Sequence, residues 1–265
     1  MSALRPVTVI TGASAGIGAA LARVFARNGH ELALVARRGD RLNALADEIA
    51  AAGKTRPVTI VADLFNDASR HVGDALKAHG VEPQYMVNNA GFGLVGTAAR
   101  LDRDEQLSMI DLNVGALTDL SLAFVDSLAR NKGGLLNVGS VAGFLPGPGM
   151  AVYYATKAYV LSFSEALHSE LKNRGVRVTV LCPGPVPTEF AARAGVTGGL
   201  APGILTQSAE TVAEQGYRGL MQGRRVVVPG LANKVATLAI RLIPRGAVLG
   251  AVDARQTKRR DARPT

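Results

Sequence analysis

Short runs of β-branched and aliphatic residues alternate with longer amphipathic stretches along most of this chain. The runs expected to form strands cover 7–11, 31–37, 58–62, 85–88, 135–139, 177–181 and 225–228. Helical patterns fill the intervals, at 16–28, 38–52, 66–79, 102–130, 152–174 and 208–222. Several of the expected strands are apolar almost throughout, as in parallel sheets that are covered on both faces. The alternation therefore predicts an α/β fold, a doubly wound parallel sheet of about seven strands with helices on both faces.

Length and composition fit one large domain. Of 265 residues, 48% are hydrophobic and 19% are charged, which favours a packed core over disorder. We expect a single catalytic domain over 1–250, followed by a basic tail over 251–265. A single cysteine excludes an internal disulfide and fits a reducing compartment. We find no secretory signal and no run of about 20 apolar residues, so we expect a cytoplasmic protein.

The formal net charge of +9 requires an explanation. Residues 250–265 hold five basic and two acidic side chains, and we interpret this tail as a solvated chain end. The alternative is a nucleic-acid or anionic-membrane binder, whose affinity would fall steeply with salt and vanish on truncation at residue 250. We expect no nucleic-acid partner. The apolar segment 231–249 leaves two interpretations open: a peripheral membrane or substrate-entry helix, or a helix packed on the domain, which we favour.

A glycine-rich turn follows the first expected strand, where residues 11–18 read TGASAGIG. Gly12 permits a tight turn, Gly16 removes the Cβ that would keep a phosphate away from the backbone, and Gly18 lets the helix pack closely on the sheet. The N-terminus of the next helix offers unpaired N–H groups to a pyrophosphate. The turn therefore predicts a Rossmann-type dinucleotide site, with Ser14 and Ile17 among its contacts.

The spacing of these glycines resembles the TGxxxGxG motif of the short-chain dehydrogenase/reductase family. The similarity continues through Asn88-Asn89-Ala90-Gly91, Ser140, Tyr153-x-x-x-Lys157 and Pro183-Gly184, within residues 11–188. The resemblance implies an oxidoreductase that transfers hydride between a nicotinamide cofactor and a carbonyl or secondary alcohol. It also implies a homodimer or homotetramer, with the helices at 102–130 and 152–174 between subunits.

The end of the second expected strand indicates which cofactor is used. An NAD-preferring fold usually places a carboxylate there, but this chain continues with Arg37 and Arg38. A guanidinium pairs with a 2′-phosphate, so we expect NADP(H), with Arg37 as the main contact and Arg38 as its helper. Arg41 is expected on the solvent face of the next helix. The resemblance adds contacts to adenine (Asp63, Leu64), the adenosine ribose region (Asn89, Ala90, Gly91) and the nicotinamide (Pro183, Gly184, Val186, Thr188).

The expected catalytic pair is Tyr153 and Lys157, which lie one helical turn apart on the same face. A phenol ionises near pH 10, and catalysis near pH 7 calls for a pKa about 3 units lower. The Lys157 ammonium and an oxidised nicotinamide would favour the phenolate, and Lys157 would also bind the nicotinamide ribose. Ser140 would donate a hydrogen bond to the substrate oxygen. Tyr154 has the wrong spacing and is expected to pack or line the pocket.

Asn113 has two interpretations. In the family, an asparagine in a Leu-Asn-Val-x-Gly context holds a water near the lysine, and residues 112–115 match that context. On this basis Asn113 joins the catalytic group. The alternative is a polar helix residue, or a kink formed with Gly115.

Apolar loop residues predict a ketone or aldehyde substrate with a hydrophobic body. Residues 182–190 and the apolar-basic C-terminus resemble the branch of the family that contains ketoacyl and steroid-type carbonyl reductases, which implies a ketoacyl or steroid-like compound. We expect residues 189–207 to form a mobile lid. The apolar residues expected at the pocket are Phe92, Leu94, Phe144, Leu145 and Phe190. Cys182 is interpreted as an apolar filler, and no histidine has metal-ligand spacing, so no metal is expected. The competing hypothesis is a non-catalytic NADP(H)-binding regulatory protein, but such a protein could lose Tyr153 or Lys157, and both are present.

Overall fold

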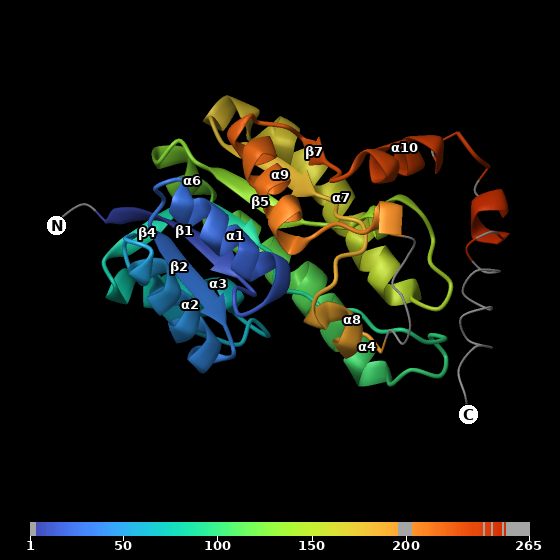
Figure 1. The fold of residues 1–265 in the computed structure, drawn as a ribbon, viewed down its shortest axis with the longest axis horizontal. Coiled ribbons are helices and arrows are strands. Elements are labelled where there is room, and N and C mark those ends of the chain that lie inside the picture. The colour runs from blue at the N-terminus through green and yellow to red at the C-terminus, as the bar shows by residue number, and fades with distance from the viewer. Residues whose placement is uncertain (1–3, 196–202, 241, 245, 251, 253–265) are drawn as a thin grey trace.

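One parallel sheet forms the centre of the molecule (Figure 1). The computed structural model describes residues 4–195, 203–240, 242–244, 246–250 and 252. The strands lie in the order β3-β2-β1-β4-β5-β6-β7. Their bounds are Arg5–Thr11 (β1), Leu32–Ala36 (β2), Val58–Val61 (β3), Val81–Asn88 (β4), Gly134–Val138 (β5), Arg177–Leu181 (β6) and Val226–Val227 (β7). The strand order reverses between β1 and β4, so the predicted doubly wound sheet is confirmed.

Helices cover both faces of this sheet. Residues of α1, α2 and α9 share one buried cluster, and residues of α3, α5, α6 and α7 share another. The helix bounds are Gly16–Arg27 (α1), Gly39–Ala51 (α2), Ala68–Ala78 (α3), Arg103–Ile110 (α4), Leu117–Ala123 (α5), Val125–Arg130 (α6), Ala151–Glu170 (α7), Glu189–Arg193 (α8), Ala209–Met221 (α9) and Leu231–Ile240 (α10). Short helical turns lie at Val141–Phe144 (η2), Lys172–Arg174 (η3) and Gly203–Leu205 (η4).

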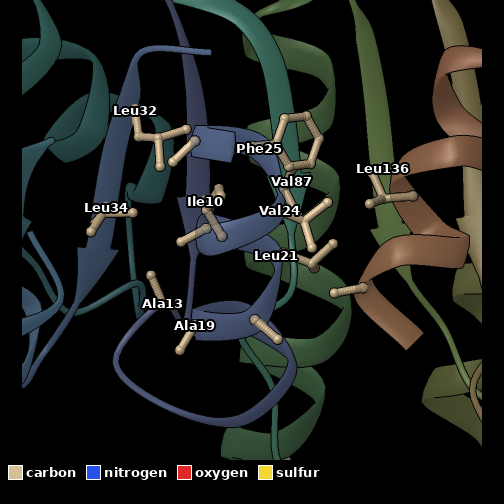
Figure 2. Close-up of a cluster of buried hydrophobic side chains, with 14 of the residues drawn as sticks. Ile10, Ala13, Ala19, Leu21, Val24, Phe25, Leu32, Leu34, Val87 and Leu136 are labelled. Atoms are coloured by element: carbon tan, nitrogen blue, oxygen red, sulfur yellow. The ribbon is translucent and has the colours of Figure 1, made fainter. Parts of the chain in front are cut away.

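Each strand contributes side chains to two cores, because successive side chains of a strand point to opposite faces of the sheet. On β1, Ile10 joins the cluster under α1 while Val9 joins the one on the other face. Figure 2 shows Leu21, Val24 and Phe25 of α1 facing this side of the sheet. Burying one such side chain stabilises the fold by about 1.5–3 kcal/mol. This packing fixes α1 over β1, and therefore fixes the turn that joins them.

The helix expected over 102–130 is interrupted, and on this point the prediction is wrong. A π-helical segment, Asp111–Ala116 (η1), separates α4 from α5, and a further break at Phe124 separates α5 from α6. Inside the π segment, the buried Asn113 side chain hydrogen-bonds the backbone of Phe92. Single-turn π segments in α-helices occur frequently at functional sites.

Parts of two predicted segments lie outside the described residues. They are 196–202 of the expected lid and, apart from Val252, the whole basic tail. Across the part of the chain that is described, none of the helices combines the length and apolarity needed to traverse a bilayer.

Candidate active site

One cavity of about 970 Å³ lies at the carboxyl ends of the strands, where the strand order reverses. Ligands of open α/β sheets bind at this switch point. All the predicted cofactor contacts except Gly18 line the cavity, and so do Ser140, Tyr153 and Lys157. Asn113 lies behind the wall instead. The structure therefore brings almost the whole predicted set to one place.

The glycine turn has the shape that its sequence predicts. Gly12 and Gly16 adopt φ values of +65° and +55°, where a side chain would be strained. A Cβ on Gly18 would lie 2.3 Å from the Gly12 carbonyl oxygen, so Gly18 serves the packing of α1 rather than the cavity. The N-cap of α1, Ala15, offers no capping side chain, and the first turn holds no acidic residue. The N-terminal N–H groups of α1 thus remain available to an anion.

Asn89 fastens this turn to the end of β4. Its Nδ2 donates to the carbonyl oxygens of Thr11 and Gly12 at 2.9 and 3.2 Å. In return, Thr11 Oγ1 accepts from the backbone N–H groups of Asn89 and Ala90 at 3.0 and 3.1 Å. The neighbouring Asn88 is buried and bonds Asn137 of β5, so it serves the core. Asn89 therefore holds the shape of the cofactor-side wall.

Arg37 and Arg38 both line the cavity but have different partners. Arg38 donates to Ser14 Oγ at 3.0 and 3.2 Å and to Glu189 Oε2 at 2.8 Å. Arg41 pairs with the same Glu189 carboxylate, so two arginines near the start of α2 hold the first residue of α8. Arg37 makes a long ion pair of 4.0 Å with Asp63, and 55% of its side chain is exposed. Arg37 thus has more capacity for an added anion than Arg38 has.

Tyr153 stands on the first turn of α7 and faces the cavity next to Ser140. Burial raises the pKa of Tyr153 to about 12, and hydrogen bonding to Ser140 opposes that rise. Ser140 Oγ also accepts the backbone N–H of Ala142 at 3.1 Å, which fixes its orientation at the end of β5. Phe190 of α8 packs against the Tyr153 ring, with ring centroids 5.4 Å apart. The phenol is therefore protonated at neutral pH, the state that can donate a proton.

Lys157 lies one turn along α7 and is 6% exposed. Its Nζ donates to the Val138 carbonyl oxygen at 2.8 Å and lies 5.9 Å from the centroid of the Tyr153 ring. Burial lowers the pKa of Lys157 to about 8. The ammonium is thus held at a fixed point beside the phenol, while burial is the largest influence on the pKa of Tyr153.

Asn113 is a buried residue that links three segments around Lys157. Its Oδ1 accepts the backbone N–H of Phe92 at 3.1 Å, and its Nδ2 donates to the Phe92 carbonyl oxygen and to Thr156 Oγ1. A Cβ on Gly91 would lie 2.7 Å from Asn113 Oδ1 and 3.8 Å from Lys157 Nζ. The side chain therefore positions the loop after β4 against α7 near the lysine.

The half of the cavity next to Tyr153 is mainly apolar. Leu145 and Phe190 line it as predicted, together with Val95, Met150 and Tyr154. The other three apolar residues expected there do not line it, so that prediction is wrong for Phe92, Leu94 and Phe144. Phe92 is buried beneath the wall because its backbone is held by Asn113, and Phe144 packs against the core cluster around Val160.

One helix that lines the cavity was not included among the predicted site residues. Asn233, Ala236, Thr237 and Ile240 of α10 all face it. Asn233 is anchored by donating to the carbonyl oxygens of Leu205 and Pro229 at 3.1 and 3.0 Å. The signal in the sequence was an Asn and a Thr four residues apart, in a segment that is otherwise apolar except for Lys234, which places both on one helix face.

Arg193 at the end of α8 also lines the cavity. Its guanidinium lies 4.4 Å from the centroid of the Phe92 ring, a cation–π contact. Burial, followed by the positive charges of Arg37 and Arg38, lowers the pKa of Arg193. Arg193 therefore adds a third guanidinium to the part of the cavity wall near Arg37 and Arg38.

Other reactive side chains take structural positions. Cys182 is fully buried, and burial raises the pKa of its thiol to about 12, which disfavours a nucleophilic thiolate. His30 contacts Phe25, Tyr85 and Tyr217 in the core. Within the described ranges, His, Cys, Asp and Glu form no cluster of three or more that could hold a metal ion.

Comparisons with known proteins agree with this geometry. A 40% identical relative is a sulfoacetaldehyde reductase from Chromohalobacter salexigens, with the match covering 78% of this chain and 84% of the relative. A short-chain dehydrogenase from Sphingobium yanoikuyae, solved in complex with NADPH, has a TM-score of 0.78 and 32% identity and covers 98% of each chain. A bulky-bulky ketone specific alcohol dehydrogenase from Comamonas testosteroni has a TM-score of 0.73 and 28% identity, covering 100% of this chain and 97% of the other.

The family assignment follows from a match over most of the described chain. Residues 6–195 match the family described as short chain dehydrogenase. This range contains the glycine turn, Asn113, Ser140, Tyr153 and Lys157. The resemblance inferred from the motifs is confirmed: the chain belongs to the short-chain dehydrogenase family of oxidoreductases.

Proposed function

We propose that this protein is an NADP(H)-dependent oxidoreductase that interconverts a bulky, apolar carbonyl compound and its secondary alcohol. The observation that carries the proposal is the division of a single cavity into two halves. Arginines 37, 38 and 193 lie in one half with the uncapped start of α1, and an apolar chamber next to Tyr153 forms the other. We take residues 1–250 as the catalytic domain and 251–265 as a separate basic tail.

The residues of the first half fit a phosphorylated dinucleotide. Gly12 and Gly16 leave a backbone cradle, and the N-terminus of α1 can hold the pyrophosphate. Arg37, with Arg38 as its helper, would hold the 2′-phosphate. Asp63 and Leu64 would contact adenine, residues 89–91 the adenosine ribose region, and residues 183, 184, 186 and 188 the nicotinamide. When bound, the nicotinamide supplies or accepts the hydride.

Three side chains carry the acid–base chemistry in this proposal. The protonated Tyr153 phenol gives its proton to the substrate oxygen as the carbonyl carbon is reduced. Ser140 donates a hydrogen bond to the same oxygen and stabilises the negative charge that develops there. The Lys157 ammonium, fixed by the Val138 carbonyl, then stabilises the phenolate left on Tyr153. Asn113 holds the loop after β4 against α7, through its bonds to Phe92 and Thr156, and so maintains this arrangement.

The apolar chamber supports a hydrophobic substrate. Its apolar lining includes Leu145, Met150 and Phe190, together with Ala236 and Ile240 of α10. Apolar lining with few polar groups is typical of sites for uncharged ligands. The ketone-specific alcohol dehydrogenase with a TM-score of 0.73 agrees with this chemistry.

A second candidate substrate class is a small anionic aldehyde, favoured by the similarity to the sulfoacetaldehyde reductase. Among the described residues of the cavity, Lys157 and Arg193 are the cations that could meet such an anion besides Arg37 and Arg38. Lys157 is committed to the Val138 carbonyl, and Arg193 lies over Phe92 on the cofactor side. These contacts favour the uncharged substrate.

Loss of NADPH absorbance with a panel of carbonyl compounds tests both points. Bulky aryl and alkyl ketones should turn over with higher kcat/KM than sulfoacetaldehyde or short oxo acids, and the reverse order would refute the substrate class. Tyr153→Phe should lower kcat by about 10²–10⁴-fold while leaving the NADPH dissociation constant near its normal value. Tyr154→Phe is the matched control and should retain turnover. A protein that binds NADPH but reduces none of the panel would instead fit the regulatory alternative.

We also infer that the protein forms a homodimer or homotetramer. Large apolar side chains are exposed along α4, α5 and α7, namely Leu107, Ile110, Leu122 and Tyr159. Exposed apolar patches of this kind mark association surfaces. Light scattering of the purified protein should give two or four chains per particle, and a monomer would contradict the inference.

A further inference from the structure

The outward side of α10 carries a row of exposed apolar side chains. Leu231, Val235 and Leu238 are 77%, 58% and 62% exposed, and Leu242 follows at 88%. The spacings of four and three residues place the first three on one narrow stripe of the helix. We call the side chains of Leu231, Val235 and Leu238 the outer face of α10. Figure 1 shows α10 at the margin of the molecule, across from α2 and α3.

The inward side of the same helix is fixed, so the outer face cannot turn into the core. Asn233 and Thr237 are 3% and 5% exposed and face the cavity. Asn233 bonds the backbone on either side of α9, at Leu205 and Pro229. It also packs so closely on Gly184 that a Cβ there would lie 2.5 Å from its Nδ2. The packing of the inward side of α10 therefore holds this apolar row at the surface.

Most of the net positive charge of the chain lies in the part of the sequence that begins with α10. Residues 231–265 contain eight Lys and Arg and two Asp, a net +6 of the +9 carried by the whole chain. Lys234, inside α10, is itself exposed. An apolar helical stripe combined with basic residues is the signature of a helix that lies in the plane of an anionic membrane surface.

We propose that the outer face of α10 docks the protein on an anionic lipid bilayer. The apolar stripe enters the boundary between headgroups and acyl chains, and the net positive charge of this part of the sequence attracts the protein to anionic headgroups. The exposed apolar side chains that we assign to association between subunits lie on α4, α5 and α7 and not on α10. Because the opposite side of α10 lines the cavity, docking places the substrate chamber next to the bilayer. The docking does not depend on the proposed function and is measured without substrate.

Sedimentation with lipid vesicles tests the proposal. The full-length protein should bind vesicles that contain phosphatidylglycerol and phosphatidylcholine, and bind pure phosphatidylcholine much less. Affinity for the anionic vesicles should fall as salt rises, because the electrostatic part is screened. The triple variant Leu231→Gln, Val235→Gln, Leu238→Gln should lose about tenfold or more of this affinity, since three apolar side chains no longer enter the lipid.

The chain offers a matched control. Val61 on β3 is 64% exposed, close to the 58% of Val235. It lies on one edge strand of the sheet, whereas α10 follows β7, the strand at the other edge. Val61→Gln should bind vesicles as the unaltered protein does, whereas Val235→Gln should bind more weakly. The triple variant should keep the far-ultraviolet circular dichroism spectrum and the melting temperature of the unaltered protein, which shows that it folds.

Four results would overturn the proposal. The first is no binding to anionic vesicles, and the second is equal binding by the triple variant. The third is a pair of results: a protein truncated after Val252 no longer binds the vesicles, but the triple variant still does. That pair would assign the interaction to the tail alone. The fourth is a triple variant that changes the oligomeric state while the unaltered protein ignores vesicles, which would make the outer face a contact with a second copy of this chain.

Discussion

Replacing Arg37 by alanine should change which coenzyme the protein prefers. Arg37 lines the cavity at the end of β2, and its nearest acidic partner is Asp63 at 4.0 Å. Arg38 already donates to Ser14 and Glu189. A 2′-phosphate in this corner would therefore take most of its charge-assisted hydrogen bonding from Arg37. NADH lacks that phosphate, so its binding should not depend on this side chain.

The size of the effect follows from the exposure of the arginine. Hydrogen bonds to charged groups contribute about 1.5–3 kcal/mol when one partner is removed. Because 55% of the Arg37 side chain is exposed, solvent screening places its contribution at the lower end, about 1.5 kcal/mol. A free-energy change of about 1.4 kcal/mol is a tenfold change in an equilibrium constant. Arg37→Ala should thus raise the dissociation constant for NADPH about tenfold.

Fluorescence titration with NADPH and NADH measures both constants on the same samples. Arg38→Ala should show a smaller loss than Arg37→Ala, since Arg38 shares its guanidinium with two protein groups. Arg41→Ala is the matched control, because Arg41 pairs with the same Glu189 but does not line the cavity. Equal weakening of NADPH and NADH by Arg37→Ala, or a larger effect from Arg38→Ala, would refute the reasoning.

Two other perturbations test the site and the turn beneath it. The kcat/KM for carbonyl reduction should decline as pH rises through about 8, because the Lys157 ammonium loses its proton there while burial keeps Tyr153 protonated up to about pH 12. A kcat/KM that is level or rising across that range would contradict this prediction. Gly18→Ala should destabilise the fold by about 1–3 kcal/mol in thermal melts, since its Cβ would lie 2.3 Å from a backbone oxygen. Gly115→Ala should be neutral or slightly stabilising, because its Cβ would meet nothing within 4 Å, and equal melting temperatures for the two variants would exclude the packing argument.

The architecture was predictable because it depends on local patterns. Apolar runs and helical periodicity placed all the strands and most of the helices, and the observed bounds differ by a few residues. The glycine turn was predictable for the same reason, since φ above zero and close packing at Gly12, Gly16 and Gly18 are properties of single positions. The break in the long helix over 102–130 was not predictable from local patterns, because it depends on Asn113 meeting the backbone of Phe92, 21 residues away.

The electrostatics of the site depend on distances that sequence spacing does not contain. Spacing placed Tyr153 and Lys157 on one helix face and suggested that the lysine would lower the pKa of the phenol. Burial instead raises the pKa of Tyr153 to about 12 and lowers that of Lys157 to about 8. The Val138 carbonyl that holds Lys157 comes from β5, 19 residues before it in the chain.

The sequence by itself determined the order of the strands and helices, the dinucleotide turn and the identities of the reactive side chains, because each is encoded within a few neighbouring residues. Tertiary structure alone decided that Asn233 and Thr237 of α10 line the cavity and that Glu189 holds Arg38 and Arg41. It also decided that Phe92 and Phe144 lie outside the chamber. These contacts join residues far apart in the chain. They form only when packing of the two cores brings the ends of the strands together, and no local pattern records which distant groups will then meet.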